Sequence, residues 1–122
     1  MTRSLVLAAM ALAGCATAPP LPSDGIARAR LNQRVYVDGP YVTPLRIVED
    51  SRCPVGVQCV SAGRTRVAVR IDLASRSEIA VLRSDRPLQV ADGQLSLVEV
   101  TPAAAGSRPG AYRFGMRFAG GI

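Results

Sequence analysis

Residues 64–73 constrain the fold more than any other segment of this 122-residue sequence. Apolar or β-branched side chains alternate there with small or charged ones, in the order Arg-Thr-Arg-Val-Ala-Val-Arg-Ile-Asp-Leu. A period of two residues is that of a β-strand with one face in a hydrophobic core and the other in water. Residues 112–118 alternate in the same way, with Arg113 and Arg117 between aromatic and methionine side chains. Both segments therefore predict amphipathic strands.

Five shorter segments also have the composition of strands, and no segment has a helical period. Pro44 should confine the start of one of them to a sheet edge or a bulge. Another changes its period between Leu97 and Val98, as a β-bulge would cause. Turn-forming residues such as Asp92-Gly93 separate these candidate strands. The five segments are residues 33–37, 42–49, 78–83, 88–90 and 95–101. Seven short strands predict an all-β fold, a small antiparallel β-sandwich, with a closed or partly open β-barrel as the alternative.

The N-terminus has the features of a targeting segment. A short basic region precedes a compact apolar run at residues 5–11, which is too short to cross a bilayer. Leu12-Ala13-Gly14-Cys15 then resembles the lipobox of bacterial lipoproteins, in which the cysteine is lipidated and the peptide before it is removed. An ordinary signal peptide with an incidental cysteine is the alternative. In lipoproteins an Asp after the cysteine causes retention on the inner membrane; Ala16 does not resemble it, which implies the outer membrane.

These features divide the chain into three parts. We expect a lipoprotein signal peptide at residues 1–14, a lipidated Cys15 with a proline-rich tether up to residue 30, and a single β domain at residues 31–122. The membrane is then a partner through the lipid on Cys15, and the folded domain faces the periplasm.

The remaining two cysteines, Cys53 and Cys59, form an even pair in what would be an oxidising compartment. Their spacing differs from the Cys-x-x-Cys redox motif, and no third or fourth soft metal ligand is available. We predict a structural disulfide; a redox-active pair and a metal site are the alternatives.

These cysteines belong to a motif, Glu49-Asp50-Ser51-Arg52-Cys53-Pro54, four residues, Cys59, three residues and Gly63. It resembles a motif of small bacterial envelope lipoproteins of uncharacterised function. The resemblance implies a secreted single domain and the disulfide, and it implies no activity. Those proteins usually carry Trp where this chain has Ser61.

The composition excludes several kinds of catalytic site. The sequence contains neither His nor Lys, so no Ser–His, Cys–His or Ser–Lys pair and no imidazole metal ligand can form. Glu49 and Asp50 are neighbours, so in a strand their side chains leave opposite faces and cannot act as a carboxylate pair. We expect Asp50 to cap loop amides or to pair with Arg52. The sequence predicts no enzyme, no cofactor and no metal ion.

The net charge is +6, and all 15 basic residues are arginines. Arg64, Arg66 and Arg70 should share one strand face, and guanidinium groups suit phosphate and carboxylate ligands. An anionic glycolipid, an acidic wall polymer or an acidic envelope protein would fit such a face; a solvated face with acidic neighbours is the alternative. Nucleic acid is not expected as a partner. The sequence thus predicts a lipid-anchored, non-enzymatic binding or structural module of the envelope, with arginine-mediated anion binding as the second interpretation.

Overall fold

A computed structural model describes residues 20–54, 56–60 and 62–120 of the protein. Eight β-strands and one short 3-10 turn, Pro109–Ala111, make up its regular structure within these residues. The strands are β1 (Ala27–Ala29), β2 (Val35–Tyr36), β3 (Tyr41–Asp50), β4 (Thr65–Asp72), β5 (Ser77–Arg83), β6 (Leu88–Val90), β7 (Gly93–Thr101) and β8 (Arg113–Ala119).

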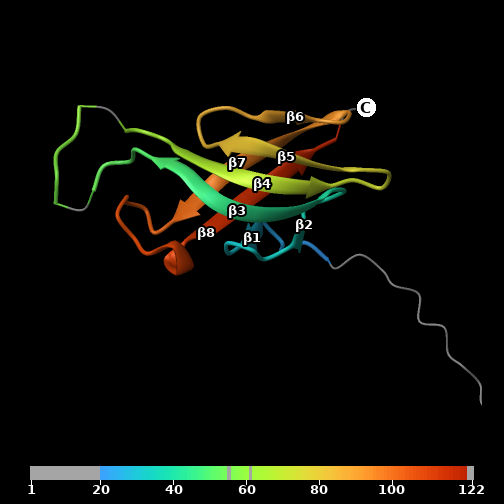
Figure 1. Ribbon diagram of the computed structural model, residues 1–122, viewed down its shortest axis with the longest axis horizontal. Coiled ribbons are helices and arrows are strands. Elements are labelled where there is room, and N and C mark those ends of the chain that lie inside the picture. Colours follow the sequence, from blue (N-terminus) through green and yellow to red (C-terminus); the bar gives the residue numbers. More distant parts are fainter. Residues whose placement is uncertain (1–19, 55, 61, 121–122) are drawn as a thin grey trace, which may run out of the picture.

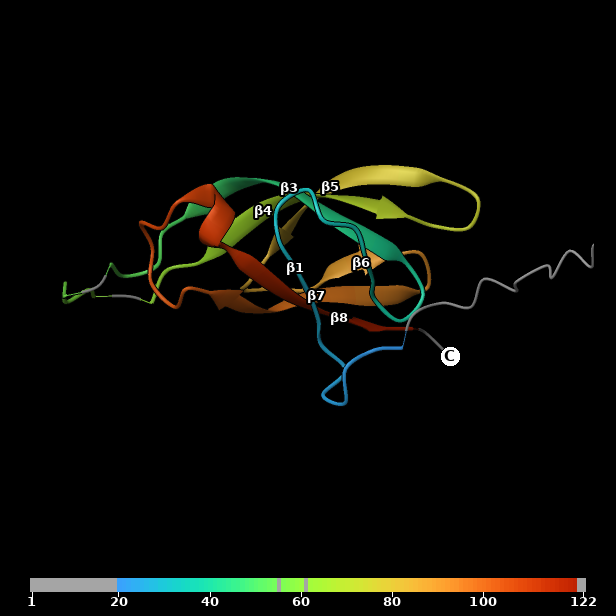
Figure 2. The same cartoon turned by 90° about the horizontal axis from the view of Figure 1, so that it is seen from below.

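The strands form two antiparallel sheets that lie face to face (Figures 1 and 2). One sheet has the order β1-β8-β7-β6 and the other the order β2-β3-β4-β5. The chain crosses between the sheets after β1 and again after β5. The two sheets do not close into a barrel within the described residues, so the predicted β-sandwich is confirmed and the barrel alternative is not.

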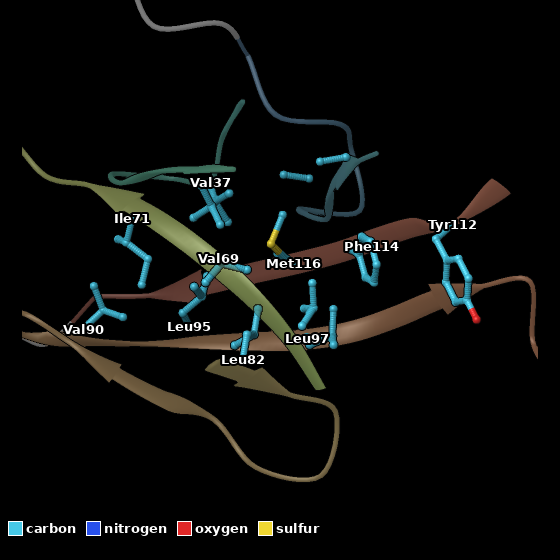
Figure 3. Packing of buried hydrophobic residues seen from close by; sticks show 14 residues of the cluster. Val37, Val69, Ile71, Leu82, Val90, Leu95, Leu97, Tyr112, Phe114 and Met116 are labelled. Carbon is cyan, nitrogen blue, oxygen red and sulfur yellow. The ribbon is translucent and has the colours of Figure 1, made fainter. Parts of the chain in front are cut away.

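The core lies between the sheets and follows the alternation seen in the sequence. Val67, Val69 and Ile71 of β4 are buried, as the period of two predicts. Phe114 and Met116 of β8 face them from the other sheet (Figure 3). Burial of these apolar side chains is the main stabilising term for a domain of this size.

The domain begins earlier than the sequence suggested, so our tether of residues 15–30 was wrong in its second half. β1 pairs with β8, with Ala27 opposite Met116 and Ala29 opposite Phe114. Leu21 also packs against the core. A three-residue strand of two alanines and an arginine leaves too short a pattern to recognise. The predicted signal peptide and Cys15 lie outside the described residues.

Two predicted irregularities are present. β3 is not an edge strand, and the register with β4 shifts between Pro44 and Arg46, so the bulge expected at Pro44 is confirmed. The register of β7 with β8 shifts between Leu97 and Glu99, at the position of the slip in the sequence. Among the described residues, no helix is long and apolar enough to cross a membrane.

Candidate functional site

The cysteine-containing motif connects β3 to β4 at one end of the sandwich. Asp50, the last residue of β3, is opposite Thr65, the first residue of β4. The connection between them leaves the body of the domain and projects along its long axis (Figure 1). Its base is closed by backbone and side-chain hydrogen bonds: Ser51 N donates to Arg64 O at 2.9 Å, and Arg64 N donates to Ser51 Oγ at 2.9 Å.

The carboxylate of Asp50 lies at the centre of a buried polar cluster. Arg52 binds it with two parallel hydrogen bonds, from Nε to Oδ1 at 2.8 Å and from Nη2 to Oδ2 at 2.9 Å. The Tyr112 hydroxyl donates to Oδ2 at 2.7 Å, and this hydroxyl marks one end of the core in Figure 3. The Asp50 side chain is 8% exposed and that of Arg52 is 13% exposed. We call Asp50, Arg52 and Tyr112 the Asp50 clamp.

Arg52 extends the clamp to the other sheet. Its Nη1 donates to the backbone oxygens of Val100, at 3.1 Å, and Pro102, at 2.6 Å. These two residues lie at the end of β7 and just beyond it. One guanidinium group therefore links the end of β3 to the β7–β8 connection. Tyr112, the residue before β8, is linked to the end of β3 by its hydrogen bond to Asp50.

The clamp holds Asp50 as a carboxylate. The hydrogen bonds from Arg52 lower the pKa of Asp50 to about 2; burial opposes this, and the Tyr112 hydrogen bond adds to it. Burial raises the pKa of Tyr112, and so does its hydrogen bond to Asp50. An acid this strong, with donors on both oxygens, is a poor proton carrier near neutral pH. The predicted pairing of Asp50 with Arg52 is confirmed, and both carboxylate oxygens of Asp50 are occupied by hydrogen bonds within the domain.

Cys53 and Cys59 are joined by a disulfide, with their Cα atoms 5.8 Å apart. This confirms the predicted bond, and the separation is within the usual range for disulfides. The loop that it closes lies in solvent: Val57 is 56% exposed and Val60 is fully exposed.

Gly63 is required by the path of this connection. Its φ of 68° lies in the left-handed region that favours glycine. A Cβ atom there would also overlap the backbone oxygen of Ser51. The motif therefore ends in Gly63 because the two arms of the connection approach too closely for any side chain.

Of the three arginines of the predicted basic face, Arg64 immediately precedes β4 and Arg66 and Arg70 lie within it. Two of the three have acidic neighbours. Arg66 forms an ion pair with Glu49 at 3.0 Å, and Arg64 approaches the same carboxylate at 3.5 Å. Arg64 also lies 4.0 Å from Asp85. The hydrogen bond from Arg66 lowers the pKa of Glu49. Arg70 is exposed and forms no ion pair within the part of the chain that the structure describes.

The structure also has a pocket that the sequence did not indicate. It has a volume of about 280 Å³ and lies beside β1 and β2, with Leu21, Val35, Tyr36 and Tyr41 in its wall. The rings of Tyr36 and Tyr41 are 5.4 Å apart, and the guanidinium of Arg34 lies 4.1 Å from the Tyr41 ring centroid. Its wall residues come from segments that are separate in the sequence, so no local pattern could reveal it.

Two other hollows, of about 320 and 370 Å³, lie beside the β7 bulge and share Ser84, Leu97 and Val98 in their walls. No group of three or more acidic or cysteine side chains in the described residues is placed to hold a metal ion. Comparison of the chain with known protein families, curated proteins and solved structures finds no match.

Proposed function

We propose that this protein is a lipid-anchored component of the bacterial cell envelope, whose folded domain is a non-enzymatic binding or structural module. The observation that carries this proposal is the bond between Cys53 and Cys59. Of the three cysteines in the sequence it leaves one, Cys15, which stands at the end of the lipobox-like segment. A structural disulfide is also typical of proteins outside the cytosol.

The Asp50 clamp supports a non-enzymatic module. Asp50 is the carboxylate of the motif that an enzyme could have used. Its two oxygens already accept hydrogen bonds from Arg52 and Tyr112. The motif thus serves to close one end of the sandwich. The second interpretation, anion binding by Arg64, Arg66 and Arg70, has less support, because Glu49 pairs with the first two.

The anchor is tested by expressing the full chain in a bacterial host and measuring the mass and N-terminus of the mature protein. We expect it to begin at Cys15, to carry added lipid mass and to partition into membranes. The Cys15→Ser variant should remain unprocessed or soluble. A matched control, Cys53→Ser with Cys59→Ser, should still be lipidated. A mature N-terminus elsewhere, without lipid mass, would contradict the proposal.

A further inference from the structure

The segment that joins the domain to the proposed anchor is short. Pro20, the first residue that the structure describes, already borders the pocket beside β1 and β2, and Leu21 packs against the core. Pro20 is five positions after Cys15 in the sequence. A fully extended chain covers at most about 3.3–3.6 Å per residue, so Pro20 lies within about 18 Å of a lipidated Cys15. The pocket is therefore held close to the surface of the membrane in which Cys15 is anchored.

The wall of this pocket has the chemistry of a membrane interface. Leu21 and Val35 supply apolar surface, and Tyr36 and Tyr41 are both half-buried. Tyrosine suits the boundary between hydrocarbon and headgroups, because its ring is apolar and its hydroxyl is polar. A volume of about 280 Å³ lies just below the usual range for ligand pockets and is enough for part of an acyl chain.

Two arginines in the wall are already neutralised. Arg28 binds Asp24 at 2.8 Å and Glu99 at 3.1 Å, and Arg34 binds Asp72 at 3.2 Å. Attraction of anionic headgroups is therefore not the main term here. Contact with lipid at this pocket should depend on apolar surface and should persist at high salt.

The disulfide loop lies toward the opposite end of the molecule. Tyr41 begins β3 at the pocket, and Asp50 ends it at the base of the loop. A strand of ten residues spans about 30 Å. Figures 1 and 2 both show the loop at one end of the long axis and the start of the described chain toward the other. The two ends should therefore differ in their distance from the membrane.

We propose that the pocket beside β1 and β2 faces the membrane and takes part of the acyl region of a lipid from the bilayer that holds Cys15, with Tyr36 and Tyr41 at the interface. The inference rests on the proposed lipid anchor. It assigns an orientation to the domain: the pocket lies against the bilayer, and the loop with Val57 and Val60 points away from it.

The test uses the absence of tryptophan from the sequence. The full-length lipidated protein with Tyr36→Trp has a single tryptophan in the pocket wall. We expect its emission to shift to shorter wavelength in vesicles of phosphatidylethanolamine and phosphatidylglycerol. Lipids with brominated acyl chains should quench most of this emission, and high salt should not restore it. Tyr41→Trp is a second probe of the same pocket, should Tyr36→Trp fail to fold.

The matched control is Val60→Trp, at the exposed end of the disulfide loop. Its emission should be unshifted and unquenched in the same vesicles. Quenching of Val60→Trp that equals or exceeds that of the pocket variants would overturn the proposed orientation. Absence of quenching in both pocket variants, with lipid mass present on Cys15, would overturn the pocket inference alone. Absence of lipid mass in the same samples would overturn the anchor and the inference together.

Discussion

Replacing Asp50 by Asn tests whether the Asp50 clamp holds the sandwich together at the end of β3. Asn has nearly the size and shape of Asp, but it removes the negative charge and replaces one acceptor oxygen by an NH2 donor. Arg52 remains charged and largely buried, at 13% exposure. It would keep its hydrogen bonds to the backbone oxygens of Val100 and Pro102 but lose the bidentate carboxylate. The variant therefore measures the cost of leaving this guanidinium without its anion, together with that of placing an NH2 group against a donor of Arg52 or Tyr112.

Two routes give similar values for the free-energy cost of the Asp50→Asn substitution. Removing one partner of a buried ion pair typically costs about 3–5 kcal/mol, and the retained carbonyl contacts of Arg52 favour the lower end. Independently, the pKa of Asp50 is lowered from 3.8 to about 2, which corresponds to about 2.5 kcal/mol at about 1.4 kcal/mol per pKa unit. We expect Asp50→Asn to lower the free energy of unfolding by about 2–3 kcal/mol at neutral pH. In a domain of this size the melting temperature should fall by roughly 10–20 °C.

The difference between wild type and variant should depend on pH. Because the pKa of Asp50 is lower in the folded state than in the unfolded state, its contribution is complete above about pH 4. It is lost as the pH falls from about 4 to about 2, when the folded protein takes up the proton. The variant lacks this contribution at every pH. The two unfolding free energies should therefore converge as the pH approaches 2.

Urea unfolding followed by circular dichroism, at neutral and acid pH, measures both effects. The control is Asp92→Asn, which alters an exposed carboxylate in the turn before β7 that forms no ion pair or hydrogen bond within the described residues. Its effect should be small at every pH. If Asp50→Asn costs no more than Asp92→Asn at neutral pH, the clamp does not stabilise the fold and our interpretation of the motif is wrong.

Two further predictions concern the same connection. Cys53→Ser together with Cys59→Ser should lower the melting temperature by roughly 8–16 °C without abolishing the fold, because closing a loop this short contributes roughly 2 kcal/mol. A reduction potential above about −200 mV would instead indicate redox chemistry. Gly63→Ala should be clearly more destabilising in urea unfolding than Gly56→Ala. Both glycines have a positive φ, which costs alanine about 1–2 kcal/mol at either position. Only at Gly63 would the added Cβ also overlap the backbone of Ser51. Equal destabilisation by the two substitutions would contradict this overlap.

The regular parts of the fold could be predicted because their signals are local. The alternation in β4 and β8 sets which side chains enter the core, and Pro44 marks a bulge because it lacks a backbone donor. The pairing of Asp50 with Arg52 was also accessible, since the two residues are only two positions apart. Each of these inferences uses residues within a few positions of one another.

The rest depends on residues that only the folded chain brings together. Tyr112 donates to Asp50 across 62 positions of sequence, and the carbonyl of Val100 accepts from Arg52 across 48. A backbone acceptor has no signature in the sequence, because every residue has one. β1 was missed for a different reason: Ala-Arg-Ala is too short and too weakly apolar to be distinguished from a tether.

The way Arg52 reaches the β7–β8 connection also bears on how this part of the sequence can change. Arg52 is held there by the main-chain oxygens of Val100 and Pro102, and not by their side chains. The path of the connection is therefore constrained, while the side chains of Val100 and Pro102 take no part in this contact. Substitutions in its stretch of small residues that preserve the backbone path should leave the guanidinium fully bonded. Apart from Gly106, whose φ of 101° favours glycine, the residues of this connection can change as long as the backbone path and Asp50, Arg52 and Tyr112 are retained.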